Sequence, residues 1–196
     1  MRVLVAALIL ASTSRYRRDL LARLGLPFET VAPGVSEAHV AQESPADRAL
    51  RLALEKARAV ARTYPQAVVI GADQVAACGD RLLDKPGDTA RCVEQLTALN
   101  GRTALFYTAC AVLGGSRAVH LAHVDTTTVL FRELSVAEIE RYVASERPFD
   151  CAGGFRAESL GISLFECIES RDPTALIGLP LIWVAAALRE TGFLLP

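Results

Sequence analysis

The order of segments along the chain predicts an α/β fold with a mixed sheet. Strand-like and helix-like segments alternate at the start, and a long hairpin-like stretch lies in the middle. Residues 3–10 form a continuous apolar run, as expected for a strand buried on both faces. A polar loop at residues 12–14 follows, and then a helix whose apolar face contains Leu20, Leu21 and Leu24.

Capping residues mark the starts of later helices. Ser44 precedes Pro45, a pair typical of a helix N-terminus, and Asp88 caps a second helix. Ser135 and Glu138 have the spacing of a capping box before a third. The helix after Ser44 is predicted to have one buried face, which includes a lysine and consists of Ala49, Leu52, Ala53, Lys56, Ala57 and Val60.

Further strands are predicted at residues 28–31, 68–70, 103–113, 119–131 and 162–168. Gly114-Gly115 is a turn signal that joins the two longest of these strands in a hairpin. A helix after Pro180 closes the chain. Because there is no internal repeat, low-complexity tract or linker, we expect residues 1–196 to form a single domain.

The composition excludes several classes of partner. The 196 residues carry a net charge of −1, so we expect neither a nucleic acid polymer nor a membrane surface as a partner. No apolar run approaches the ~20 residues that span a bilayer. Residues 3–11 resemble the apolar part of a signal peptide, but the polar segment that follows is no cleavage site. Five cysteines without metal-ligand spacing indicate buried or half-buried free thiols in a reducing compartment, which predicts a cytoplasmic protein.

The first candidate site is the junction between the first strand and its helix. Ser12, Thr13 and Ser14 supply hydroxyls at a helix N-terminus, where unpaired N–H groups favour anions. Arg17 and Arg18 add forked cations that suit phosphate oxygens. Two interpretations are open: a phosphate-binding loop, or an ordinary serine-capped helix with solvated arginines.

Carboxylates and lysines elsewhere could complete such a site. Asp73 follows a buried strand, where α/β proteins place ligand chemistry, although it could also be a turn residue that bonds its own backbone. Glu37 is an ordinary surface carboxylate unless it converges with Asp73, in which case the two could hold Mg²⁺ beside phosphate oxygens. Lys56 in its apolar face either extends to solvent or, with Lys85 before Pro86, forms a focused anion pocket.

Together these motifs resemble the Maf family of nucleotide pyrophosphatases over nearly the whole chain. The matching segments lie, in chain order, at residues 9–14 with Arg17-Arg18, Glu37, Glu55-Lys56-Ala57, Ile70-Gly71-Ala72-Asp73, Asp84-Lys85-Pro86, residues 151–155 and residues 177–181. Each motif alone is weak, whereas their order and spacing make the resemblance specific.

The resemblance implies an inosine-triphosphatase-like fold: a mixed twisted sheet with flanking helices and two lobes around a central cleft, often as a homodimer. It implies that a small-molecule nucleoside triphosphate is hydrolysed to a monophosphate and diphosphate with a divalent cation, Mg²⁺, Mn²⁺ or Co²⁺. By position, Asp73 is the expected catalytic base and, with Glu37, a metal ligand. The residues expected to bind phosphate are Ser12, Ser14, Arg17, Arg18, Lys56 and Lys85.

Three positions indicate which base is bound. Tyr16, Gln74 and Glu158 resemble the branch of the family that hydrolyses 7-methyl-GTP, whereas the dTTP and UTP branch usually has threonine and glutamine at the last two. A positively charged 7-methylguanine would stack on Tyr16 by cation–π attraction and donate N–H groups to the carboxylate of Glu158. The chain departs from the commoner opening motif at Arg15, which replaces a proline.

Two alternatives stay open at this point. The first is a pyrophosphatase of the same family that acts on dTTP or UTP, with Tyr16 packed beneath the first helix and Glu158 simply solvated. The second is a nucleotide-binding regulator, because the family is also associated with inhibition of septum formation and cell division.

Overall fold

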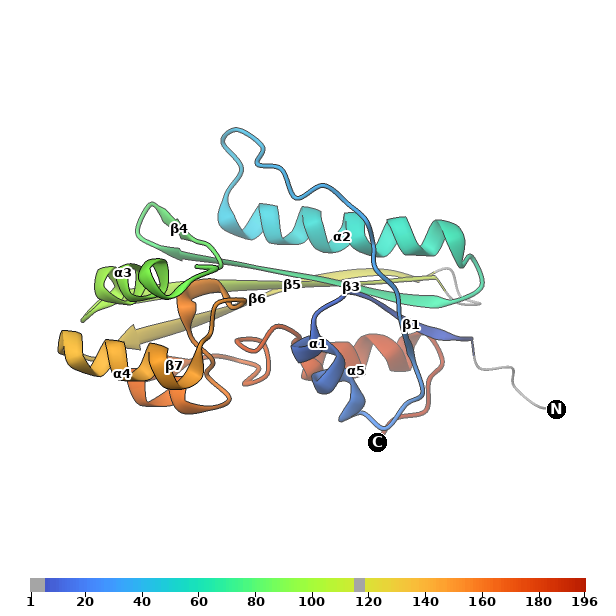
Figure 1. Cartoon of the computed structure of the whole chain (residues 1–196). Helices are drawn as coiled ribbons and strands as arrows, with labels where there is room; N and C mark the ends of the chain where they lie inside the picture. Colours follow the sequence, from blue (N-terminus) through green and yellow to red (C-terminus); the bar gives the residue numbers. More distant parts are fainter. Residues whose placement is uncertain (1–5, 115–118) are drawn as a thin grey trace. The chain divides into compact units, whose positions relative to one another are not determined.

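The computed structural model describes residues 6–114 and 119–196 (Figure 1). Its sheet has the strand order β2-β1-β3-β5-β6-β7, with β4 paired to β3. The strands are β1 (Leu8–Ala11), β2 (Glu29–Thr30), β3 (Val68–Cys78), β4 (Arg81–Leu83), β5 (Thr103–Gly114), β6 (Val119–Phe131) and β7 (Phe165–Glu169). The helices are α1 (Arg15–Ala22), α2 (Pro45–Thr63), α3 (Thr89–Leu99), α4 (Val136–Glu146) and α5 (Leu181–Glu190), with 3-10 turns η1 (Ala152–Gly154) and η2 (Leu160–Leu164).

The sheet is mixed, which confirms the predicted α/β class. Strand β1 pairs with both β2 and β3 in parallel, whereas β4 pairs antiparallel with β3 and β7 antiparallel with β6. The register places Ala11, the last residue of β1, opposite Gly71 of β3. Strand β3 therefore continues beyond the carboxyl end of β1, and Asp73 lies on this extension.

The described residues divide into two compact units. The first contains α1, α2 and α5 and comprises, of the described residues, 6–73, 108–114, 119–125 and 172–196. The second contains α3 and α4 and comprises Gln74–Tyr107 and Thr126–Arg171. Strands β3, β5 and β6 contribute residues to both units. The expectation of a single domain stays a prediction.

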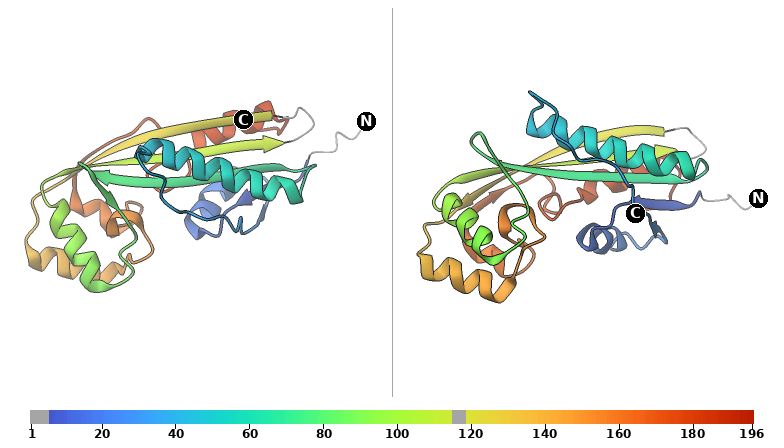
Figure 2. Two further views of the ribbon diagram at one scale, coloured as in Figure 1. Left: turned by 90° about the horizontal axis from the view of Figure 1, so that it is seen from above. Right: turned by 45° about the horizontal axis from the view of Figure 1, so that its top comes forward.

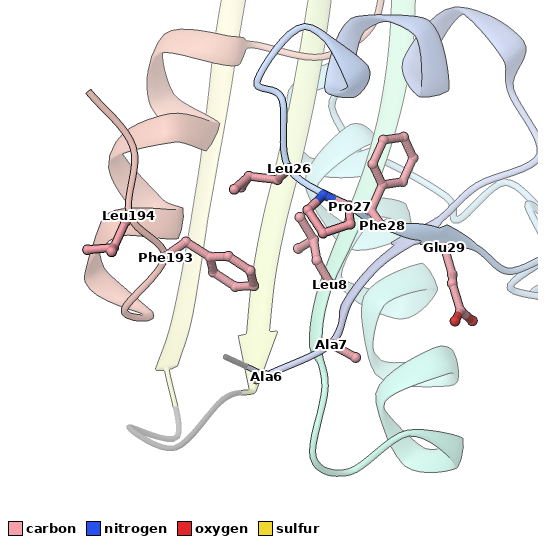
Figure 3. Close-up of a pocket in the computed structure, with 9 residues that line it drawn as sticks. All are labelled: Ala6, Ala7, Leu8, Leu26, Pro27, Phe28, Glu29, Phe193 and Leu194. Atoms are coloured by element: carbon pink, nitrogen blue, oxygen red, sulfur yellow. The ribbon is translucent and has the colours of Figure 1, made fainter. Parts of the chain in front are cut away.

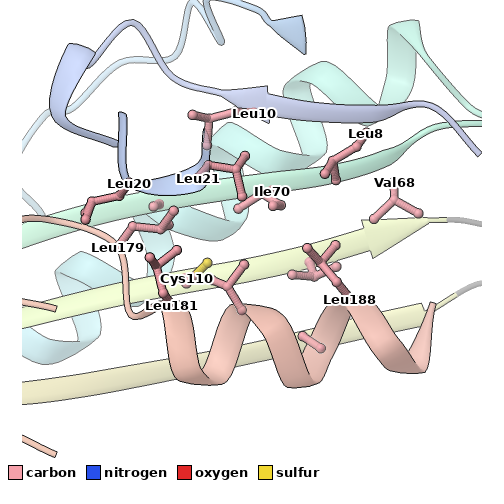
Figure 4. Close-up of a cluster of buried hydrophobic side chains, with 14 of the residues drawn as sticks. Leu8, Leu10, Leu20, Leu21, Val68, Ile70, Cys110, Leu179, Leu181 and Leu188 are labelled. Atoms are coloured by element: carbon pink, nitrogen blue, oxygen red, sulfur yellow. The ribbon is translucent and has the colours of Figure 1, made fainter. Parts of the chain in front are cut away.

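In the first unit, helices cover both faces of the sheet (Figure 1). One face packs against α1 and α5 through a cluster that includes Leu10, Leu21, Ile70, Cys110 and Leu188 (Figure 4). The other face packs against α2 through Ile9, Ala11, Ala57, Val60, Val69 and Ala111. Neighbouring residues of β1 and β3 thus enter opposite clusters, as the period of a strand requires.

In the second unit, α3 packs against α4 (Figure 2). An aromatic cluster forms part of its core. The rings of Phe106, Phe131, Phe155 and Phe165 meet edge to face, with centroids 4.8–5.6 Å apart. The predicted capping box of α4 is present. Hydrogen bonds from the backbone N–H and hydroxyl of Ser135, together with one from Arg132, lower the pKa of Glu138 to about 2.

Most predicted helix starts and faces are confirmed. Ser44, Asp88 and Ser135 cap α2, α3 and α4, and the last helix begins directly after Pro180. The buried face of α2 consists of the six residues that the sequence pattern predicted, the lysine included: Ala49, Leu52, Ala53, Lys56, Ala57 and Val60.

Several boundaries differ from the prediction. The first described strand begins at Leu8, while residues 3–5 lie outside the described part, as does Gly115 of the predicted hairpin turn. Residues 160–164 form the 3-10 turn η2, because Gly161 brings the chain back on itself there, so the strand predicted at 162–168 begins only at Phe165. All five cysteines are free, but Cys167 is exposed, not buried or half-buried. Within the described residues, no helix combines the length and apolar character needed to cross a bilayer.

The most consequential correction concerns Asp73. It was predicted to follow the strand, as a site residue or turn residue, but it lies inside β3, which extends to Cys78. The strand was predicted at residues 68–70 only, yet it continues through Gly71, whose lack of a side chain permits close contact with α2. A Cβ at Gly71 would lie 2.3 Å from the carbonyl oxygen of Ala53 and 2.6 Å from the nitrogen of Ala57.

We therefore expect Gly71→Ala to destabilise the protein by about 3 kcal/mol, since the added methyl group collides with helix backbone that has no rotamer by which to move away. Gly25→Ala is the control: its Cβ meets nothing within 4 Å, and its φ of +69° costs only about 1 kcal/mol. Urea unfolding of both variants measures the difference. Equal losses would contradict the close packing of α2 on β3.

Candidate active site

The loop between β1 and α1 is built around two serine side chains. Ser12 is only 6% exposed, and its hydroxyl accepts a hydrogen bond of 3.1 Å from the backbone N–H of Ser14. Ser14 is the N-cap of α1 and accepts from the N–H of Arg17 at 3.4 Å. The first turn of α1 contains no acidic residue, so nothing in that turn offsets the positive end of the helix dipole. The junction is thus a capped helix start whose local field favours an anion.

The two arginines of this loop differ in their surroundings. The Nε of Arg17 donates to the carbonyl oxygen of Gly178 at 3.0 Å, which directs this guanidinium. Arg18 is exposed and its Nε donates to Asp19 at 3.2 Å. Arg17 is therefore the better oriented of the two predicted phosphate ligands.

The segment that orients Arg17 is itself held by a buried carboxylate. Asp172, 3% exposed, accepts from the N–H and hydroxyl of Thr174 and from the N–H of Ile182 at 2.6–2.9 Å. The hydroxyl oxygen of Thr174 in turn accepts a hydrogen bond from the backbone N–H of Leu181 at 2.9 Å. Asp172 and Thr174 were not among the predicted site residues, although an Asp-x-Thr segment before a Gly-Leu-Pro turn is a recognisable signal for such a cap.

A buried lysine joins the two predicted metal-ligand carboxylates. Lys56 of α2 is 6% exposed, and its Nζ donates to Oδ1 of Asp73 at 2.6 Å. The same Nζ forms an ion pair with Oε1 of Glu37 at 2.5 Å. Glu37 thus converges with Asp73, which was the condition set for it to be more than a surface carboxylate. One of the two interpretations of the sequence was that Lys56 extends to solvent. The structure contradicts it, because the lysine is buried.

The loop that carries Glu37 is fastened to α2 by two arginines. Arg48 donates to the carbonyl oxygen of Glu37, and Arg51 to that of Ala38, each at 3.2 Å. Arg51 also forms a two-pronged ion pair with Glu43 at 2.6 and 2.7 Å, whose hydrogen bonds lower the pKa of that carboxyl. Sequence reasoning missed both arginines. Their only signal was their spacing three residues apart on a helix that begins just after an acidic loop.

The ring of Tyr16 forms a cation–π contact with a neighbouring side chain in this structure. The guanidinium carbon of Arg15 lies 4.8 Å from the centre of the Tyr16 ring, and Arg15 also donates to the phenol oxygen at 2.7 Å. Arg15 is the residue that replaces the family's proline. The substitution therefore places a charged side chain against one face of the predicted base-stacking ring.

Three predicted site residues belong to the second unit. Gln74 is half-buried and follows Asp73 in β3, so the two side chains lie on opposite faces of that strand. Lys85 is exposed and is the second residue after β4, and Glu158 is exposed between η1 and η2. That these three residues join Asp73 and Lys56 in one site stays a prediction.

An apolar pocket lies elsewhere in the first unit (Figure 3). Its cavity measures about 480 Å³, and its lining consists of Ala6, Ala7, Leu8, Leu26, Pro27, Phe28, Glu29, Phe193 and Leu194. Glu29 is the one charged side chain in this lining, which offers no lysine or arginine to pair with a phosphate. This pocket is therefore less suited to a nucleotide than Lys56 and the β1–α1 loop with its two serines.

The comparison with known proteins agrees with these motifs. Residues 7–191, nearly the whole chain, match the Maf-like protein family. The chain belongs to this family. The match includes the β1–α1 loop, the Glu37 loop, Lys56 and Asp73, so the sequence resemblance is confirmed.

Curated relatives of this Maf-like chain carry a specific name. A 7-methyl-GTP pyrophosphatase of Xanthomonas oryzae pv. oryzae (strain MAFF 311018) is 54% identical over 96% of this chain and 98% of its own length. Proteins of the same name from Aromatoleum aromaticum and Pseudomonas savastanoi pv. phaseolicola are 51% and 48% identical, over 96% and 97% of this chain and 97% and 99% of their own lengths.

The buried ion pair of Lys56 and Asp73 should be visible in the stability of this Maf-like chain. Replacing Lys56 by Met leaves Asp73 buried without its ammonium partner and close to Glu37, so we expect a loss of about 3 kcal/mol in the free energy of unfolding at pH 7. Lys85→Met, at an exposed lysine, is the control and should change stability by about 0.5 kcal/mol or less. Urea unfolding tests both. The double variant Lys56→Met/Asp73→Asn should be more stable than Lys56→Met alone, and the opposite order would contradict the pairing.

Proposed function

We propose that this chain hydrolyses 7-methyl-GTP to 7-methyl-GMP and diphosphate, as a cytoplasmic enzyme that removes a non-standard nucleotide. The observation that carries the proposal is the convergence of Glu37 and Asp73 on the ammonium of Lys56. The names of its full-length relatives support the substrate.

The carboxylates suit a hard divalent cation such as Mg²⁺, Mn²⁺ or Co²⁺. Two carboxylates and one ammonium together carry a net charge of −1, so the cluster attracts cations. Within the described part of the chain no group of three or more Asp, Glu, His or Cys side chains could hold a metal. Glu37 and Asp73 would therefore hold the ion jointly with phosphate oxygens and water, the arrangement usual for Mg²⁺ at nucleotide sites. When bound, such an ion polarises a phosphoryl oxygen.

Hydrolysis forms a bond between a water oxygen and the α-phosphorus and breaks the bond from that phosphorus to the bridging oxygen of the diphosphate. Asp73, held in place by Lys56, accepts the proton of the attacking water as its general base. The negative charge that grows on the phosphate oxygens is stabilised by cations and N–H donors aimed at them. We assign this role to Arg17, Arg18, Lys56 and Lys85, with the α1 N-terminus and its serines, Ser12 and Ser14.

The base is selected by the remaining residues. The Tyr16 ring attracts a cation, and Arg15 stands against it in the structure. We propose that the cationic 7-methylguanine stacks on this ring, while Glu158 accepts from the N–H edge of the base. Gln74 supports the same preference by position in the family.

Asp73→Asn should lower kcat for 7-methyl-GTP about a thousandfold, because a general base of this kind contributes about 10²- to 10⁴-fold. Nucleotide affinity, measured by calorimetry, should change little. Asp80→Asn, at an exposed aspartate of the turn between β3 and β4, is the control for a lost charge. If Asp73→Asn releases diphosphate as fast as the control, Asp73 is not the general base. If the wild-type protein binds the nucleotide but does not hydrolyse it, the result favours a nucleotide-binding regulator.

A panel of 7-methyl-GTP, GTP, dTTP and UTP with Mg²⁺ tests the substrate. We expect Glu158→Gln to lower kcat/KM for 7-methyl-GTP by about tenfold or more, the usual effect of losing a charge-assisted hydrogen bond, and to leave dTTP nearly unchanged. Glu166→Gln, at an exposed carboxylate of β7, is the matched control. A wild-type preference for dTTP or UTP would replace our substrate by the pyrimidine alternative.

A further inference from the structure

Glu158 lies in a turn whose two ends touch. It is exposed, and it stands between Arg156 and Gly161. The N–H of Ser159 lies 3.4 Å from the carbonyl oxygen of Arg156. A Cβ at Gly161 would lie 2.2 Å from that oxygen and 2.9 Å from the Arg156 nitrogen, so only glycine permits this close approach. The exposed carboxylate is thus presented by a compact turn at residues 156–161.

One face of α4 holds this turn. Tyr142 and Glu146 are four residues apart and therefore lie on the same face of the helix. The buried phenol oxygen of Tyr142 accepts from the backbone N–H of Arg156 at 3.1 Å. Burial raises the pKa of Tyr142, so its phenol stays protonated at neutral pH.

Glu146 contacts the turn on both sides of Glu158. Its Oε1 accepts from the guanidinium of Arg156 at 3.2 Å, and its main-chain oxygen accepts from the same nitrogen at 3.1 Å. Its Oε2 accepts from the backbone N–H of Leu160 at 2.9 Å, and it also receives a hydrogen bond from the side chain of Ser159. A single carboxylate thus binds the residues that precede and follow Glu158.

The carboxylate of Glu146 is charged and confined. Its side chain is 13% exposed. Burial by itself raises the pKa of Glu146, but the hydrogen bonds from Ser159 and Leu160 and the charge of Arg156 outweigh it and lower the pKa below its usual value. Such a group, with several donors and little room to rotate, fixes the backbone that it binds.

We propose that Glu146 is a positioning residue for base selection: it fixes the turn at residues 156–161 so that Glu158 meets the base at a defined place. The inference rests on the proposed function, in which Glu158 accepts from the purine edge. A carboxylate discriminates between bases only when its own position is fixed by the shell of residues around it. Without Glu146, Glu158 keeps its charge but loses its fixed place.

The test compares selectivity, defined as kcat/KM for 7-methyl-GTP divided by kcat/KM for dTTP, in purified full-length variants with Mg²⁺. Glu146→Gln keeps an oxygen for the N–H of Leu160 and removes one of the two carboxylate charges that pair with Arg156, while that of Asp150 remains. We expect it to lower selectivity about tenfold. Its kcat for dTTP and its melting temperature should stay near those of Glu140→Gln, the control at an exposed carboxylate of the same helix. If Glu146→Gln does not fold, Tyr142→Phe, which removes only the acceptor for the N–H of Arg156, should lower selectivity in the same direction by a smaller factor.

The double variant Glu146→Gln/Glu158→Gln distinguishes action through Glu158 from a general structural role. If Glu146 acts through Glu158, the double variant should be no less selective than Glu158→Gln alone. Equal losses for both nucleotides, or additive losses in the double variant, would overturn the inference. A selectivity that falls with Glu158→Gln but not with Glu146→Gln would overturn the positioning role alone, whereas no change with Glu158→Gln would refute the base assignment itself.

Discussion

A lysine ammonium enclosed by two carboxylates is the interaction on which the candidate site depends. Lys56 comes from the middle of α2, Asp73 from β3 and Glu37 from an irregular loop, so a single nitrogen joins three elements of the first unit. Burying the charges of Lys56 and Asp73 separately would cost several kcal/mol each, and pairing offsets that cost. The cluster is therefore stable only when α2, β3 and the loop all lie in their observed places.

The close contact between α2 and β3 makes this pairing possible. Gly71 allows the backbone of α2 to approach the strand on either side of Lys56, at Ala53 and Ala57. Two residues further along β3, Asp73 points to the same face, because strand residues alternate. The lysine consequently meets the carboxylate while both stay shielded from water.

Elements with a local cause were predictable from the sequence, and those set by distant contacts were not. Serine and aspartate caps and the apolar face of α2 depend on neighbours within one or two turns, so their patterns sufficed. The path of the Glu37 loop depends on guanidiniums that bind main-chain carbonyls. Because every residue has a carbonyl, the sequence does not indicate which ones are bound. The turn that presents Glu158 is likewise held through backbone N–H groups. The candidate site residues could be predicted from the sequence, but the hydrogen bonds and turns that position them could not.

The turn around Glu158 and the residues that hold it all fall between positions 142 and 161, within one unit and one uninterrupted stretch of chain. The residues proposed for phosphate chemistry lie outside that stretch. Of the three residues proposed to select the base, Glu158 alone lies in this stretch, whereas Tyr16 and Gln74 are neighbours in sequence of the residues proposed for phosphate chemistry. Changes confined to this stretch can therefore alter the contact between Glu158 and the base while the residues proposed for bond cleavage stay unchanged. The same separation makes this segment a natural unit for exchange between homologues.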